Sequence, residues 1–127
     1  MAASPLDSTT IDRLDAAIEV DAHTPRRDGS TSSRPIWVVV SDGDAYVRSY
    51  RGASGAWYRR ARADGELTLV VDGDEVHATA EPVDDAGINR RVSDAYRDKY
   101  GERSPGPTGT MVGDEVSQTT LRLGGGA

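Results

Sequence analysis

The chain has 127 residues, of which 36% are hydrophobic and 28% charged, and its 21 acidic and 15 basic side chains give a net charge of −6. This length fits one domain, and the acidic excess excludes a nonspecific nucleic-acid binder, because affinity for the phosphate backbone depends on cationic side chains. With no cysteine and only two histidines, the sequence excludes disulfides, thiol nucleophiles and histidine-rich metal sites.

No apolar run approaches the roughly 20 residues that cross a bilayer, and residues 1–7 lack the basic head and apolar stretch of a signal peptide. We therefore expect a cytoplasmic protein with no membrane partner. The acidity fits either a high-salt cytoplasm or a GC-rich genome, and both explanations stay open.

The N-terminal quarter predicts one helix and one polar segment. Apolar residues recur at the helical spacing over about residues 9–20, after a polar start. Residues 21–34 mix Pro, Gly, Ser, Thr and three arginines without apolar periodicity, which predicts a loop or a poorly paired strand. Residues 1–7 are expected to be frayed.

Two hairpins follow, each predicted from a strand rich in β-branched residues, an Asp-Gly turn and a second strand. The first joins residues 36–40 to 45–50, and the second joins residues 66–71 to 75–83. Between the hairpins we predict a loop over residues 52–55 and a short helix over residues 57–63.

The C-terminal third predicts a helix, a long loop and a last strand. Asp84 and Asp85 can cap a helix over residues 86–100, which Gly101 ends. The Gly/Pro-rich segment that follows reads as a loop, residues 116–123 as a strand, and residues 124–127 as a flexible tail. Together these elements predict one domain over residues 1–127, mainly β within the α+β class: a small antiparallel barrel with peripheral helices.

The segment YVRSYRGASGAWYRR, residues 46–60, carries the most distinctive chemistry. On a strand, Arg48 lies on the same face as Tyr46 and Tyr50. The Gly-containing turn after Arg51 and the helix start behind it can present backbone N–H groups to a phosphate or carboxylate, with guanidinium groups adding bidentate contacts. The alternative is that Arg48 and Arg51 pair with nearby carboxylates, while the aromatic residues fill the core.

A family resemblance adds to this interpretation. The stretch RPIWVVVSDGDAYVRSYRGASGAWYRRA, with EVHATAEPVDD and AYRDKYG, resembles a small family of uncharacterised prokaryotic domains. That family is itself similar to the split β-barrel, nitroreductase-like proteins that bind FMN or a deazaflavin. The resemblance covers about residues 11–123 and implies a split barrel, a homodimer with ligand sites at its interface, and a cofactor phosphate held by Arg34, Arg48, Ser49 and Arg51. The candidate cofactor-binding residues are Arg34, Trp37, Arg48, Ser49, Tyr50, Arg51, Gly52, Trp57 and Tyr58.

Two functions stay open from the sequence. One is an FMN- or deazaflavin-dependent oxidoreductase, which needs few catalytic side chains because the cofactor carries the electrons. The other is a cofactor-free module that binds a small anionic metabolite in the same arginine and aromatic cleft, and a barrel enzyme with a non-redox reaction is a third, more remote reading. No catalytic residue and no metal ligand is assigned. Lys99, near a helix C-terminus, is expected to be structural.

Overall fold

Seven antiparallel strands form one sheet in the computed structural model, which describes residues 6–125. The strand order is β2-β1-β5-β6-β7-β4-β3. The strands are β1 (Val20–Pro25), β2 (Thr31–Ile36), β3 (Val39–Ser41), β4 (Asp44–Val47), β5 (Glu66–Val71), β6 (Asp74–Pro82) and β7 (Leu121–Gly125). The two end strands, β2 and β3, are separated in the chain only by Trp37 and Val38. Because two residues span only a few ångströms, the sheet must curl until its ends meet at this corner.

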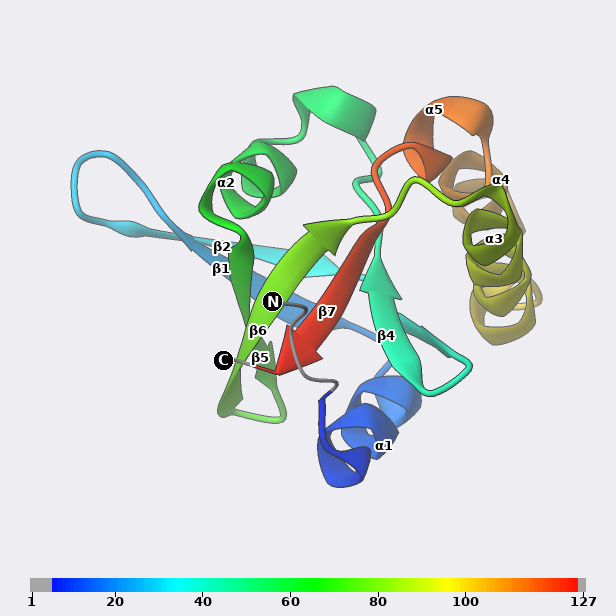
Figure 1. Ribbon diagram of the computed structural model, residues 1–127, viewed down its shortest axis with the longest axis horizontal. Coiled ribbons are helices and arrows are strands. Elements are labelled where there is room, and N and C mark those ends of the chain that lie inside the picture. The colour runs from blue at the N-terminus through cyan, green and yellow to red at the C-terminus, as the bar shows by residue number, and fades with distance from the viewer. Residues whose placement is uncertain (1–5, 126–127) are drawn as a thin grey trace.

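Five α-helices surround the curled sheet (Figure 1). They are α1 (Ser8–Ala16), α2 (Ala56–Asp64), α3 (Ala86–Tyr100), α4 (Pro105–Met111) and α5 (Asp114–Ser117), with a 3-10 turn η1 (Gly52–Ser54) before α2. Figure 1 shows α3, α4 and α5 as one group, apart from α1 and α2. The fold is therefore a mainly β, α+β half-barrel with peripheral helices, which confirms the predicted fold class.

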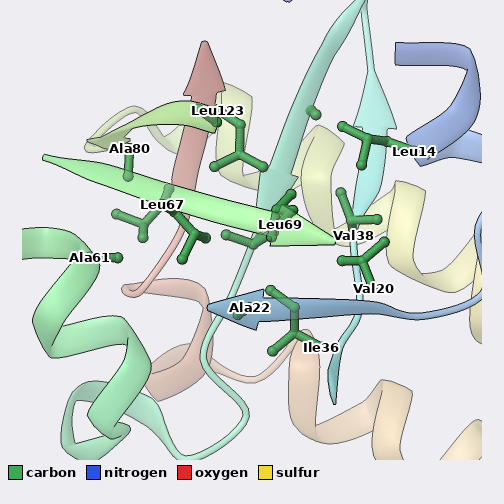
Figure 2. Close-up of a cluster of buried hydrophobic side chains, with 14 of the residues drawn as sticks. Leu14, Val20, Ala22, Ile36, Val38, Ala61, Leu67, Leu69, Ala80 and Leu123 are labelled. Carbon is green, nitrogen blue, oxygen red and sulfur yellow. The ribbon is translucent and has the colours of Figure 1, made fainter. Parts of the chain in front are cut away.

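The interior of the barrel is filled by side chains from alternate strand positions. On β5, Leu67, Leu69 and Val71 are buried while their neighbours are not, as the two-residue period of a strand requires. Figure 2 shows Leu67 and Leu69 in one buried cluster with side chains from β1, β6, β7, α2 and the corner. A second apolar cluster, which includes Val92, lies between α3 and the sheet.

Both hairpins and the long helix are confirmed. In each hairpin turn an aspartate and a glycine have positive φ, with φ of 52° at Asp42 and 50° at Asp72, the geometry that favours Asp-Gly in two-residue turns. The helix predicted over residues 86–100 is α3, and Asp85 caps it by accepting a hydrogen bond from Ile88 N at 2.9 Å. The short helix predicted after the first hairpin is α2.

Residues 21–34, predicted as a loop or a poorly paired strand, instead form the well-paired β1–β2 hairpin, which projects from the body of the molecule (Figure 1). On β1 the buried positions alternate, but one of them is Thr24, so the apolar period is hidden in the sequence. The first helix ends at Ala16, earlier than predicted, since β1 already begins at Val20.

Residues 36–40 do not form the single strand that was predicted. The chain leaves β2 at Ile36, turns at Trp37 and Val38, and enters β3 at Val39. A barrel corner made of β-branched and aromatic residues has the same local composition as a strand, which is why the sequence did not show it. The predicted partner strand also stops early, at Val47.

The loop predicted after residue 101 contains α4 and α5, and the last strand begins at Leu121 instead of residue 116. Helix α4 starts with Pro105, a favourable first-turn residue whose missing N–H costs nothing there. At the ends, Asp7 caps α1 through Thr10 N, and Gly124 pairs with Thr79 in the sheet, so neither is frayed. The rest of the expected tails, residues 1–5 and 126–127, lie outside the described residues.

Candidate functional site

A cavity of about 630 Å³ lies between the β1–β2 hairpin, the segment from β4 to α2, and α4. This volume falls in the range of small-molecule and cofactor pockets. Its lining residues are Glu19, Arg26, Ser32, Arg34, Pro35, Ile36, Trp37, Arg48, Ser49, Tyr50, Arg51, Ser54, Gly55, Ala56, Trp57, Arg60, Pro107 and Met111.

Seven of the nine candidate residues line this one cavity. They are Arg34, Trp37, Arg48, Ser49, Tyr50, Arg51 and Trp57. The other two lie elsewhere: Gly52 is buried in the turn after β4, where its φ of 69° favours glycine. Tyr58 is buried in the barrel core. Trp57 belongs to both places, since it lines the cavity and packs in the core.

Arg48 is a buried cation, only 1% exposed. Its guanidinium donates to Thr120 Oγ1 at 2.8 Å, to Ser93 Oγ at 2.8 Å, and to the carbonyls of Met111 at 3.0 Å and Asn89 at 2.9 Å. Burial lowers its pKa, yet a guanidinium stays charged in proteins.

Arg48 lines the cavity but, among the described residues, does not pair with a carboxylate, which was the alternative considered from the sequence. It does not stand exposed at the cavity mouth, and it forms no ion pair with a carboxylate in residues 6–125. All of its hydrogen-bond acceptors are neutral oxygens, which take four of its five N–H donors but leave its charge without an opposite charge. This uncompensated charge at the cavity wall favours an anion in the cavity.

The other cavity arginines keep more of their surface in solvent. Arg26, Arg34 and Arg51 are exposed, and the half-buried Arg60 donates to Thr24 Oγ1 at 3.3 Å. With Arg48, five arginines line the cavity against the single acidic residue Glu19. The alternative that Arg51 pairs with a carboxylate is also wrong within the described residues, whose ion pairs do not include it.

Ser49 and the start of α2 form a second polar feature of the cavity. Ser49 is fully buried, and its Oγ has no hydrogen-bond partner among the described residues. A Cβ at Gly55 would collide with that oxygen, so any other residue at this position would force Ser49 Oγ or the start of α2 to shift. No side chain caps α2, and the free N–H groups and dipole of a helix N-terminus favour an anion.

Sequence reasoning missed several residues of the cavity. Arg60 follows Ala56 and Trp57 at helical spacing, so the i, i+3, i+4 rule could have placed it on the same face. Arg26 and Ser32 come from the β1–β2 hairpin, which was predicted as a loop or a poorly paired strand. Pro107 and Met111 come from α4, for which the Gly/Pro-rich sequence gave no helical signal.

Lys99 lies outside this cavity and has a structural role, though not the expected one at its own helix end. Its Nζ donates to the carbonyl of Leu14 at 3.0 Å and to that of Val38 at 2.7 Å. It thus joins the end of α1 to the corner between β2 and β3. Burial lowers the pKa of Lys99 to about 8, an effect that Asp15 partly opposes.

A family model matches residues 10–123, nearly the whole chain. The chain belongs to the DUF2255 family. This family is described as uncharacterized proteins conserved in bacteria. No curated protein matches the chain.

Solved structures of similar fold include an F420-H2 dependent reductase, with 13% identity, coverage of 84% of this chain and 93% of that one, and a TM-score of 0.57. An FAD-binding protein from Mesorhizobium loti has 18% identity, coverage of 100% and 95%, and a TM-score of 0.55. A heme storage protein from Vibrio cholerae has 9% identity, coverage of 97% and 92%, and a TM-score of 0.63. At these identities the likeness establishes the split-barrel fold.

Within residues 6–125, none of the helices has the length and apolar character needed to cross a membrane.

Proposed function

We propose that this DUF2255 protein binds a phosphorylated flavin-type cofactor, FMN or a deazaflavin, in the cavity and acts as an oxidoreductase. The observation that carries the proposal is the charge of the cavity: five arginines line it against one glutamate, in a chain whose net charge is −6. Because arginine binds phosphate and carboxylate through paired N–H donors, this concentration of guanidinium groups supports an anionic ligand.

The residues of the cavity fit such a cofactor. The unpartnered Ser49 Oγ, the uncapped start of α2 and the exposed Arg34 and Arg51 are suited to a phosphate. The aromatic side chains of Trp37 and Tyr50 are suited to a planar ring. A bound flavin would supply the electron transfer, and the chain's own residues would hold its anionic group, orient its ring and limit access of water.

The structural neighbours support cofactor binding by this fold, since two of them are named for F420-H2 and for FAD. Another is named for heme storage, so the fold alone does not select the cofactor. The arginines are what favour a phosphorylated ligand. Heme therefore belongs among the compounds to be tested.

The second candidate function is a cofactor-free module for a small anionic metabolite. It is favoured by the same arginines together with Ser32, Ser49 and Ser54, which also line the cavity. Guanidinium and hydroxyl groups suit a compact anionic metabolite as well as the phosphate of a flavin. This function predicts saturable binding of phosphorylated or carboxylated metabolites, and no binding of flavins.

The test is a titration of the purified protein with FMN, a deazaflavin and heme, followed by absorbance. We expect saturable binding of FMN or the deazaflavin, weakened about 10- to 150-fold in Arg34→Ala, the worth of a hydrogen bond to a charged group. Arg27→Ala is the matched control, because Arg27 is equally exposed on the same hairpin but does not line the cavity. Binding of neither flavin would refute the proposal, and binding of heme alone would replace it.

We also propose that the protein is a homodimer in the cytoplasm, with a second copy covering the cavity. The rim of the cavity is accessible: Arg34, Tyr50, Arg51 and Pro107 are all exposed. A ligand bound there would be shielded from water by a partner surface. Cell fractionation tests the location, and light scattering tests the dimer.

A further inference from the structure

The corner at Trp37 and Val38 is held firmly by the end of α3. Lys99 Nζ donates to the Val38 carbonyl at 2.7 Å, and Tyr100 Oη lies 3.3 Å from the same oxygen. Tyr100 Oη also donates to the carbonyl of Ile18 at 2.8 Å. The backbone that carries the Trp37 side chain is therefore fixed by contacts that come from outside its own strands.

The indole ring of Trp37 is itself fixed by stacking. It lies parallel to the ring of Tyr100, with a centroid distance of 4.0 Å and an angle of 3° between the planes. Tyr100 is 1% exposed and packs in turn against Tyr96, at 6.2 Å between centroids, over which the Arg48 guanidinium lies. One face of Trp37 is thus covered by a rigid aromatic row that runs into the core.

Part of the Trp37 side chain is accessible to a ligand, since Trp37 lines the cavity and is only half-buried. The other two aromatic residues of the cavity differ from it. Trp57 is 8% exposed and packs edge-on against Tyr58, whereas Tyr50 is 55% exposed. Among these three aromatic residues, only Trp37 is both stacked against a buried ring, that of Tyr100, and partly exposed in the cavity.

We propose that Trp37 is the stacking surface for a planar, extended heteroaromatic ring, and that Tyr100 is the positioning residue that fixes its plane. This inference rests on the proposed function and deepens it, because it defines the ligand class as a planar ring that carries an anionic group. The ring lies against Trp37, and the anionic group lies among the arginines. Stacking on an aromatic side chain typically changes affinity by about 5- to 150-fold.

The test uses four probes: riboflavin, FMN, anilinonaphthalene sulfonate, which is an aromatic anion with a planar naphthalene ring, and inorganic pyrophosphate. The chain has two tryptophans, so the tryptophan emission of Trp57→Phe comes from Trp37 alone. We expect the aromatic probes to quench this emission. We also expect Trp37→Leu to bind FMN and the sulfonate about 5- to 150-fold more weakly than the unmodified protein does, with the affinity for pyrophosphate unchanged.

Two further variants test the role of Tyr100. Tyr100→Leu removes the ring behind Trp37 and is expected to weaken binding of the aromatic probes without changing that of pyrophosphate. Tyr100→Phe keeps the stacked ring and is expected to restore the affinity. A merely structural role would predict equal losses for all probes.

The outcomes separate this inference from the proposed function. If neither FMN nor the deazaflavin binds while the sulfonate binds and quenches Trp37, the proposed function fails and the inference stands. If FMN binds equally well to Trp37→Leu, the inference is overturned while the proposed function stands. If no aromatic probe quenches Trp37 in the Trp57→Phe protein, the inference is also overturned.

Discussion

Two neighbouring arginines of similar sequence context have different roles in this molecule. Arg48 is buried and links α3, α4 and the segment before β7 through neutral acceptors, whereas Arg51, three residues later, is exposed beside the cavity. The sequence could predict that both belong to the site region, because they flank the turn after a strand. It could not predict which one is buried, since the acceptors of Arg48 lie 41 to 72 residues away.

We predict that substitution of Arg48 lowers the stability of the fold, whereas substitution of Arg51 lowers ligand affinity. Arg48→Met leaves several buried acceptors without their donor and is expected to lower the free energy of unfolding by at least about 2 kcal/mol. Arg51→Ala changes an exposed side chain and is expected to alter stability by less than about 0.5 kcal/mol, while weakening FMN binding. Urea unfolding and FMN titration on both proteins test this, and a stable Arg48→Met would contradict it.

Gly55 carries a second residue-scale prediction. A methyl group at this position collides with the buried Ser49 Oγ, so Gly55→Ala is expected to destabilise the protein by about 1–3 kcal/mol, the usual cost of overpacking. Ser49→Ala removes the colliding oxygen, which has no protein partner among the described residues. The double variant should therefore recover part of the loss in urea unfolding. Strict additivity of the two changes would argue against the collision.

At the scale of elements, the C-terminal end of α3 closes the barrel. Lys99 and Tyr100 contact the end of α1 and the corner between β2 and β3, three segments that are far apart in the sequence. The helix itself is predictable from its apolar period and its aspartate cap. Its role in closure is not, because Lys99 reads as an ordinary basic residue of a last helical turn.

The elements that the sequence predicted share strong local signals. The Asp-Gly hairpins and α3 have turn residues and periodicity that need no tertiary context. The β1–β2 hairpin and α4 lack such signals: their buried positions include Thr24, Ser32 and Thr108, polar residues that only the packed fold makes interior. The secondary structure of these segments is therefore determined by tertiary packing and not by local preference.

Lys99 and Tyr100, at the end of α3, lead to a prediction of how the stability of the protein depends on pH. The pKa of Lys99 is lowered to about 8 by burial, so between pH 8 and its ordinary value of 10.5 the folded chain holds fewer protons there than the unfolded chain. Stability should therefore rise with pH from about 8 to about 10. Burial raises the pKa of Tyr100 to about 12 and also raises that of Tyr96. Above pH 10 the unfolded chain releases protons that the folded chain keeps, and stability should fall.

Urea unfolding from pH 7 to 11.5 measures this profile. Lys99→Met should flatten the rise, and Tyr100→Phe should reduce the fall, whatever each substitution does to stability at pH 7. The same slope in Lys99→Met as in the unmodified protein would show that other groups cause it.

At the scale of the whole molecule, the cavity and the chain as a whole have opposite charge. The chain has a net charge of −6, yet five arginines line one cavity with an exposed rim. Guanidinium groups gathered around a cavity concentrate anions there. An acidic exterior makes two copies repel at low ionic strength, and salt screens this repulsion over about 10 Å at 0.1 M.

We predict that the dimer forms through the rim of the cavity and strengthens with salt. In residues 6–125, the exposed large hydrophobic side chains are Tyr50, which is 55% exposed at the rim, and Ile18, which is 50% exposed and does not line the cavity. A partner seated on the rim would bury Tyr50, since an aromatic ring among arginines is typical of the centre of an interface. Tyr50→Glu is then expected to dissociate the dimer, whereas Ile18→Glu, the matched control, is not.

Light scattering at micromolar concentration in moderate and high salt tests this prediction. A monomer in both conditions refutes the dimer, and a dimer that Ile18→Glu dissociates while Tyr50→Glu does not places the interface away from the cavity.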